Sequence, residues 1–222
     1  MDTYSFPRSQ ELFVRAAAVI PCGVYGHFSP APLVPPDAYP FFARSGRGAH
    51  FTDVDGNDFI DYMCAYGPMV LGYDDQVVHE AAARQRERGD ILGCASPVMI
   101  ELAEKLTSMI AGADWAFFAK NGGDAVSYAT MIARAATGRP IIVAIEGGYH
   151  GVAPWMQGLG HHGVLPGDVA DVVRIPWNDA AAFERVLDEH AGKVAGFIAT
   201  PYHHPTFADS ELPREEYWGR IR

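Results

Sequence analysis

Apolar and polar positions follow one another in blocks, and the block lengths predict alternating strands and helices. Short apolar runs, which are typical of buried strands, occupy residues 115–119, 141–145, 172–175 and 196–199. Between them, apolar positions three and four apart predict helices that end near residues 137 and 190, and a polar-faced helix fits residues 75–88. Strands that alternate with helices of this length indicate βαβ units. We therefore expect an α/β fold with a mainly parallel sheet and helices on both faces.

The N-terminal region shows a different pattern. Ser9 is in position to cap a first helix that Pro21 stops, and residues 21–47 form an irregular arm rich in Pro and Gly. Two apolar stretches, 51–54 and 59–62, flank Asp55-Gly56-Asn57 and predict a β-hairpin. Ser96-Pro97 opens another helix with one apolar face, which we expect to be buried: Met99, Leu102, Leu106 and Met109.

Charge and composition exclude several classes of function. The net charge of −10 argues against nucleic acid, which requires clustered Lys and Arg. No apolar run approaches the ~20 residues of a membrane span, and the N-terminus shows no secretory signal. The three cysteines, Cys22, Cys64 and Cys94, are far apart and odd in number, which favours a reducing, cytoplasmic location.

A glycine loop follows the first predicted strand of the α/β region. Gly122-Gly123 opens a helix, where bare amides can hold a phosphate, although the dipeptide by itself favours a plain tight turn. Tyr149-His150 lies in a second glycine loop and offers an aromatic ring, either to a flat ligand or to the sheet edge. These loops and residues 200–204 all follow predicted parallel strands, so we expect them to converge at one edge of the sheet. The chain has neither the dinucleotide fingerprint nor the P-loop.

Two possible metal patterns are weak. Asp53, Asp55 and Asn57 imitate a calcium loop, but Asp58 stands where that loop needs Gly and no Glu closes it, so a hairpin turn is favoured. The adjacent pairs His161-His162 and His203-His204 lack the spacing of zinc ligands and are more typical of solvated loops.

An ordered series of motifs resembles the class III aminotransferases of pyridoxal-phosphate (PLP) fold type I, especially the glutamate-1-semialdehyde aminomutase branch. The motifs that carry the resemblance are Pro21-Cys22-Gly23-Val24, Asp53-Val54-Asp55-Gly56-Asn57, Tyr66-Gly67-Pro68-Met69-Val70-Leu71-Gly72, Ala133-Arg134-Ala135-Ala136-Thr137-Gly138-Arg139 and Gly147-Gly148-Tyr149-His150-Gly151. The resemblance implies that residues 1–64 are part of a small domain and that residues 65–222 are an incomplete PLP-binding large domain. It also implies a homodimer.

The resemblance assigns roles by position. Asn121, Gly122 and Gly123 would hold the cofactor phosphate, without the hydroxyl that the family's Thr supplies at the place of Gly123. Tyr149 would stack on the pyridine ring with His150 beside it, and Tyr66 and His27 would lie on the substrate side. The arm from 25 to 29 lacks the Arg of the semialdehyde enzymes, and Thr200 replaces an acidic residue, which implies a different small-molecule amino substrate.

The family's catalytic residues do not align with this sequence. The Schiff-base Lys and the Asp that pairs with the pyridine nitrogen would lie beyond Arg222, and Lys105, Lys120 and Lys193 are poorly placed for that chemistry. We therefore expect no catalytic residue here and interpret the chain as the N-terminal half of a PLP-dependent transaminase or aminomutase. Two alternatives stay open, namely a non-catalytic assembly module and an α/β protein that binds a nucleotide or sugar phosphate.

Overall fold

The structure is a computed structural model that describes residues 4–24, 34–158, 160–205 and 209–222. The chain forms two compact units, Met1–Ser96 and Pro97–Arg222, which are described separately. Among the described residues, no helix combines the length and the apolar character that crossing a bilayer requires.

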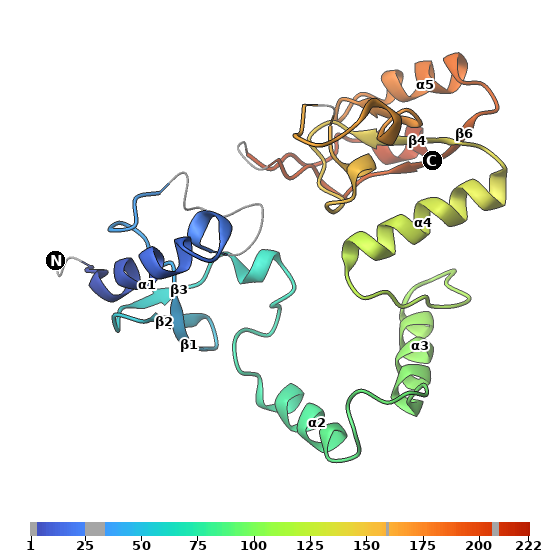
Figure 1. The fold of residues 1–222 in the computed structure, drawn as a ribbon. Helices are drawn as coiled ribbons and strands as arrows, with labels where there is room; N and C mark the ends of the chain where they lie inside the picture. Colours follow the sequence, from blue (N-terminus) through green and yellow to red (C-terminus); the bar gives the residue numbers. More distant parts are fainter. Residues whose placement is uncertain (1–3, 25–33, 159, 206–208) are drawn as a thin grey trace. The chain divides into compact units, whose positions relative to one another are not determined.

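The first unit contains a small antiparallel sheet (Figure 1). Its strands are β1 (Ala43–Arg47), β2 (His50–Asp53) and β3 (Asp58–Ile60), in the order β1-β2-β3, and the predicted hairpin is confirmed as β2 and β3. Asp53 is fully buried and organises the turn, since its carboxylate accepts the backbone N–H groups of Asp55 and Asn57 and the Asn57 side-chain amide. The other elements are α1 (Pro7–Ala17), α2 (Gln76–Arg86) and the short 3₁₀ turns η1 (Pro21–Gly23) and η2 (Cys64–Tyr66).

The start of α1 differs from the prediction that Ser9 caps it, which is wrong. The helix begins at Pro7, whose fixed φ suits the first helical position, so Ser9 lies inside the first turn and is fully buried. The backbone N–H groups of Arg8 and Ser9 donate to the carboxylate of Asp55 at 2.7 and 2.9 Å. The hairpin turn, and not a neighbouring side chain, therefore caps this helix.

The second unit contains the parallel sheet that the sequence predicts. Its strands are β4 (Ile141–Ile145), β5 (Val172–Ile175) and β6 (Val194–Ile198), in the order β5-β4-β6. The helices are α3 (Pro97–Met109), α4 (Gly122–Thr137), α5 (Ala180–Glu189) and α6 (Tyr217–Ile221), with 3₁₀ turns η3 (Pro154–Met156) and η4 (Pro166–Asp168).

Helices cover both faces of the central strand, as predicted. All five residues of β4 are buried, and Val143 on one face packs in a core with Phe183 and Val186 of α5. On the other face, Gly196 of β6 lies against α4, where a Cβ on this glycine would be 3.6 Å from the Cβ of Ala133. The ribbon shows α4 and α5 on opposite sides of β4 and β6 (Figure 1). The sheet is thus fixed between α5 and α4, and the first glycine loop forms the start of α4.

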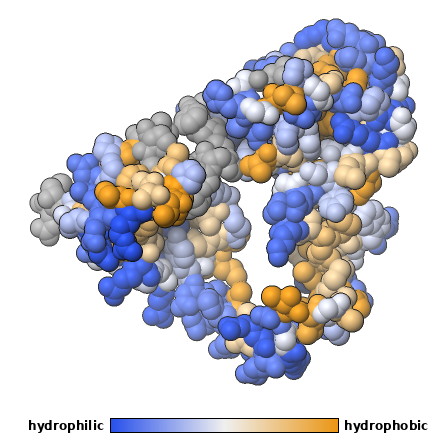
Figure 2. Space-filling model, viewed as in Figure 1, coloured by the Kyte–Doolittle hydropathy of each residue, from blue (hydrophilic) through white to orange (hydrophobic). Residues whose placement is uncertain are grey.

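Two predictions about the start of this unit are wrong. Residues 115–119 form no strand, because no strand in the described part of the chain pairs with them, and Trp115 and Phe117 are exposed. The apolar face of α3 is not buried either, since Met99, Leu102 and Met109 are exposed. Figure 2 shows apolar side chains on the surface over α3. In both places the sequence pattern is present, but the described residues provide no partner that covers it.

Candidate functional site

The first glycine loop forms the N-terminus of α4. Asn121 is the N-cap: its Oδ1 accepts the N–H of Asp124 at 2.9 Å, and its Nδ2 donates to the Asp124 carboxylate at 3.0 Å. The amides of Gly122 and Gly123, the first two helical residues, have no acceptor within the helix. Among the described residues, apart from the adjoining backbone, no atom lies within 4 Å of the place where a Cβ on Gly122 would stand, so space for an anion is open there.

The second glycine loop follows β4 and touches the first. Gly151 has φ +129°, a conformation that side chains rarely adopt. A Cβ on Gly151 would stand 2.9 Å from the Cα of Gly123, and a Cβ on Gly123 would stand 3.6 Å from the Cα of Gly151. The two loops therefore meet backbone to backbone, at a distance that only glycine permits.

The third loop completes the convergence that the sequence predicts. A Cβ on Gly147 would lie 3.7 Å from the Cε1 atom of His203, so residues 200–204 border the loop after β4. The ring of His203 in turn stacks on Trp177, which follows β5, with the ring centroids 5.8 Å apart. All three loops lie at the carboxyl edge of the sheet, where α/β folds bind their ligands.

Tyr149 and His150 occupy very different environments within the second loop. Tyr149 is about half exposed, at 49%, while His150 is 8% exposed. The Nε2 atom of His150 is buried without a hydrogen-bond partner among the described residues, and a Cβ on Gly148 would lie 3.3 Å from it. Burial, and then the positive charge of Arg174, lower the pKa of His150, so the imidazole is neutral near pH 7.

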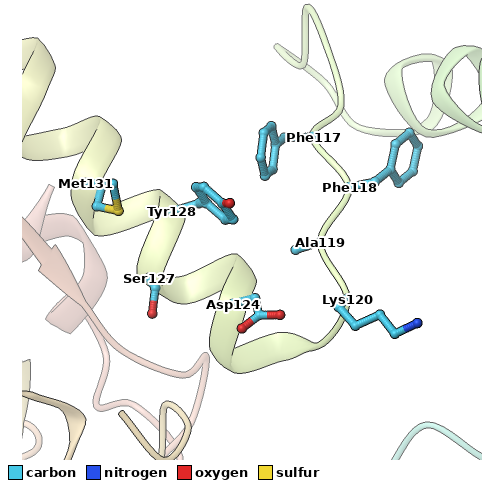
Figure 3. Close-up of a pocket in the computed structure, with 8 residues that line it drawn as sticks. All are labelled: Phe117, Phe118, Ala119, Lys120, Asp124, Ser127, Tyr128 and Met131. Carbon is cyan, nitrogen blue, oxygen red and sulfur yellow. The ribbon is translucent and has the colours of Figure 1, made fainter. Parts of the chain in front are cut away.

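A groove of about 510 Å³ runs along the outer side of α4 (Figure 3). It opens where residues 117–120 pass the helix, and the rings of Phe117 and Tyr128 meet there with centroids 4.8 Å apart. The side chain of Lys120 extends away from α4, and Gly122 and Gly123 do not line this groove. The lining residues are Phe117, Phe118, Ala119, Lys120, Asp124, Ser127, Tyr128 and Met131.

The two residues predicted on the substrate side lie outside the described part of the second unit, so their placement stays a prediction. Tyr66 belongs to the first unit, is 60% exposed, and ends a run of three left-handed residues with Cys64 and Ala65. His27 lies outside the described residues.

Sequence reasoning missed Arg174 of β5. Its Nη2 donates to the backbone carbonyls of Met156 and Gln157, both at 2.9 Å, and to that of Trp155 at 3.4 Å. Gln157 then donates through its side chain to the carbonyl of Gly151 at 2.8 Å. The available signal was a single charge inside the otherwise apolar run 172–175.

Comparison with known proteins agrees with this geometry. The model of the family described as aminotransferase class-III matches residues 34–201, about three quarters of the chain. The chain belongs to the class III aminotransferases. This family is PLP-dependent, and its fold-type I architecture is the one described above.

Relatives within the class III aminotransferases carry different activities. The chain is 43% identical over 211 residues to the aminopentol aminotransferase of Sphingopyxis macrogoltabida, covering 95% of this chain and 49% of the relative. It is 34% identical over 204 residues to the glutamate-1-semialdehyde 2,1-aminomutase of Thermoplasma volcanium, covering 87% of this chain and 47% of the relative. Among solved structures, the PLP internal aldimine form of the FumI protein from Sphingopyxis sp. MTA144 matches with a TM-score of 0.91 and 42% identity, over 97% of this chain and 51% of that chain. The chain spans about half the length of the relatives it matches.

The residues in the glycine loops fit the cofactor of this class III family. PLP carries a phosphate and a flat ring, and the loops offer open amides at a helix N-terminus beside a loop with an accessible phenol. The close contact of Gly123 with Gly151 leaves no room for side chains that would separate these two features.

Proposed function

We propose that this chain provides the phosphate- and ring-binding loops of a PLP-dependent enzyme that moves an amino group between an amine or amino acid and a carbonyl compound, as a transaminase or an aminomutase. The observation that carries the proposal is the backbone contact between Gly123 and Gly151. It holds a helix N-terminus and an aromatic loop side by side, which matches a ligand that is anionic at one end and aromatic at the other.

The phosphate end is held by backbone groups. The N–H groups of Gly122 and Gly123 point from the first turn of α4, and the helix dipole contributes about 0.3–2 kcal/mol to binding an anion there. Asn121 supports this turn indirectly, because its side chain is occupied by Asp124. Since no hydroxyl stands at position 123, the grip on the phosphate depends on these amides.

The ring end is held by the second loop. Tyr149 provides a phenol that stacks on the pyridine ring, a contact worth about 0.5–1.5 kcal/mol beyond the area it buries. The neutral imidazole of His150 is buried within the same loop and adds no charge next to the phosphate. When bound, PLP supplies the electron sink for the transfer.

We propose that the substrate is an amine without the carboxylate of glutamate semialdehyde. Residues 25–29 contain no arginine, so the two-pronged carboxylate contact that an arginine makes is missing from this arm. The relative named aminopentol aminotransferase supports an amino alcohol as the class of substrate. Tyr66 and His27 are the residues that we assign to the substrate side.

We further propose that the enzyme is a cytoplasmic homodimer, with residues 1–64 in its small domain and 65–222 in its large domain. Cys22, Cys64 and Cys94 are free thiols, as in a reducing compartment, and apolar residues of α3 are exposed on the surface. Light scattering of the purified protein at its full coding length tests the dimer, and a monomeric mass contradicts it.

Titration with PLP tests the function. The protein that carries this chain, expressed at its full coding length, should bind PLP with a shift of the visible absorption band. Gly123→Val should weaken binding strongly because the side chain separates the two loops. Gly167→Val is the control, because Gly167 has no strained φ and the space around an added carbon is open among the described residues. Binding of a nucleotide or sugar phosphate without any response to PLP would refute the proposal.

A further inference from the structure

The geometry points to Arg174 as a positioning residue that holds the loop carrying Tyr149 against the glycine loop at the start of α4. This inference rests on the proposed function, because it gives the contact between the loops its role. Arg174 lies on β5, outside both loops, and acts on the contact between Gly123 and Gly151 through other residues.

The first contact joins β5 to η3. A single guanidinium nitrogen of Arg174 lies within hydrogen-bond distance of three successive backbone carbonyls, those of Trp155, Met156 and Gln157. These carbonyls lie at the end of a 3₁₀ turn, so a cation that binds all three fixes the turn to the sheet. Because Arg174 is half-buried, these bonds are partly shielded from water.

The second contact joins η3 to the site. The side-chain amide of Gln157 donates to the carbonyl of Gly151, which lies on the residue that touches Gly123. Met156, which is 3% exposed, packs against Gly151: its sulfur would be 2.7 Å from a Cβ on Gly151. Movement of η3 away from β5 would therefore withdraw both supports of Gly151.

The charge of Arg174 also acts on His150, which lies in the loop that carries Tyr149. Its guanidinium lowers the pKa of His150 in addition to the effect of burial, and the nearby carboxylate of Glu146 partly offsets the burial of the guanidinium itself. The loop between β4 and η3 is thus hydrogen-bonded to Arg174 at its C-terminal end. Arg174 also affects the pKa of His150, the residue after Tyr149. The hydrogen bonds through η3 hold the two glycine loops in one arrangement before any ligand arrives.

The test compares Arg174→Met with Arg139→Met in the protein at its full coding length. Arg139 is the matched control, because it also donates to a backbone carbonyl, that of Val194, but at the opposite edge of the same sheet. Two quantities are measured: hydrogen exchange of residues 146–158 without cofactor, and the dissociation constant of PLP together with the circular dichroism band of the bound cofactor.

We expect Arg174→Met to speed exchange in residues 146–158 and to raise the dissociation constant of PLP about tenfold, which corresponds to about 1.4 kcal/mol. Arg174→Lys should recover part of both, because it keeps the charge but cannot reach all three carbonyls in one plane. Arg139→Met should leave both unchanged.

Unchanged exchange, or faster exchange with an unchanged PLP dissociation constant and dichroism band, would overturn the inference. If Arg174→Met fails to fold, Gln157→Leu breaks the second contact alone and decides by the same two readouts. A wild-type protein that does not bind PLP refutes the proposed function, whereas the exchange measurement still reports on the contact of Arg174 with the loop.

Discussion

Replacing Gly151 by alanine should destabilise the second unit more than any nearby glycine change. At φ +129° a non-glycine residue costs about 1–3 kcal/mol. The added methyl group would also lie 2.9 Å from the Cα of Gly123 and 2.7 Å from the sulfur of Met156. The thioether can turn aside, but the Gly123 backbone moves only with the start of α4, and such overpacking costs about 1–3 kcal/mol. We therefore expect a loss of about 2–6 kcal/mol in the free energy of unfolding.

Urea unfolding followed by tryptophan fluorescence measures this loss directly. All four tryptophans of the chain, Trp115, Trp155, Trp177 and Trp218, lie in the second unit, so the signal from this chain reports on that unit. Gly158→Ala is the matched control: Gly158 lies seven positions further along, has no strained φ, and has open space around the added carbon within the described part of the chain. Its effect should stay within about 0.5 kcal/mol. A loss below about 1 kcal/mol for Gly151→Ala would refute the close contact between the loops.

Three further predictions concern other contacts. Asn121→Ala removes the cap that binds the N–H of Asp124 and should cost about 1 kcal/mol of stability in urea unfolding, whereas a serine at this position should preserve most of it. Asp55→Ala removes the acceptor for the first turn of α1, including the N–H of Ser9, and should reduce the helical circular dichroism; an unchanged spectrum would contradict this. Because the folded pKa of His150 is lowered from 6.5, the unfolded chain binds a proton that the folded chain does not, so stability should fall as pH drops below about 6.5 and be constant above it. His150→Asn should flatten this pH dependence of the urea midpoint, and an identical dependence in both proteins would rule out the histidine as its source.

Local signals in the sequence predicted the elements whose ends are defined by neighbouring residues. The helix from Gly122 to Thr137 begins after a capping Asn121 and ends at Gly138, which adopts φ +67°. The helix after Asp179 is likewise capped by its own preceding side chain. In these cases the decisive hydrogen bonds connect residues within a few positions, so the pattern and the structure agree.

Predictions that depended on distant partners were wrong or incomplete. The apolar run 115–119 has the composition of a strand, but a strand exists only where another pairs with it, and none does so in the described chain. The N-terminal cap of α1 comes from Asp55, and no pattern near Ser9 indicates that residue. The role of Arg174 depends on carbonyls 17 to 19 positions away, which no spacing rule identifies. The convergence of the loops after β4 and β6 was predictable, because parallel strands bring their carboxyl ends to one edge. The first glycine loop reaches the same edge without a strand before it, through the contact of Gly123 with Gly151.

The cap on α1 sets an order of events during folding. The carboxylate that receives the amides of Arg8 and Ser9 lies 47 and 46 positions later in the chain. A nascent chain emerging from the ribosome carries this helix before the hairpin turn exists, so its first turn stays frayed until Asp55 has been synthesised and the turn around Asp53 has closed. The first turn of α1 is therefore completed by a segment that is synthesised later, and its stability depends on the hairpin of the first unit.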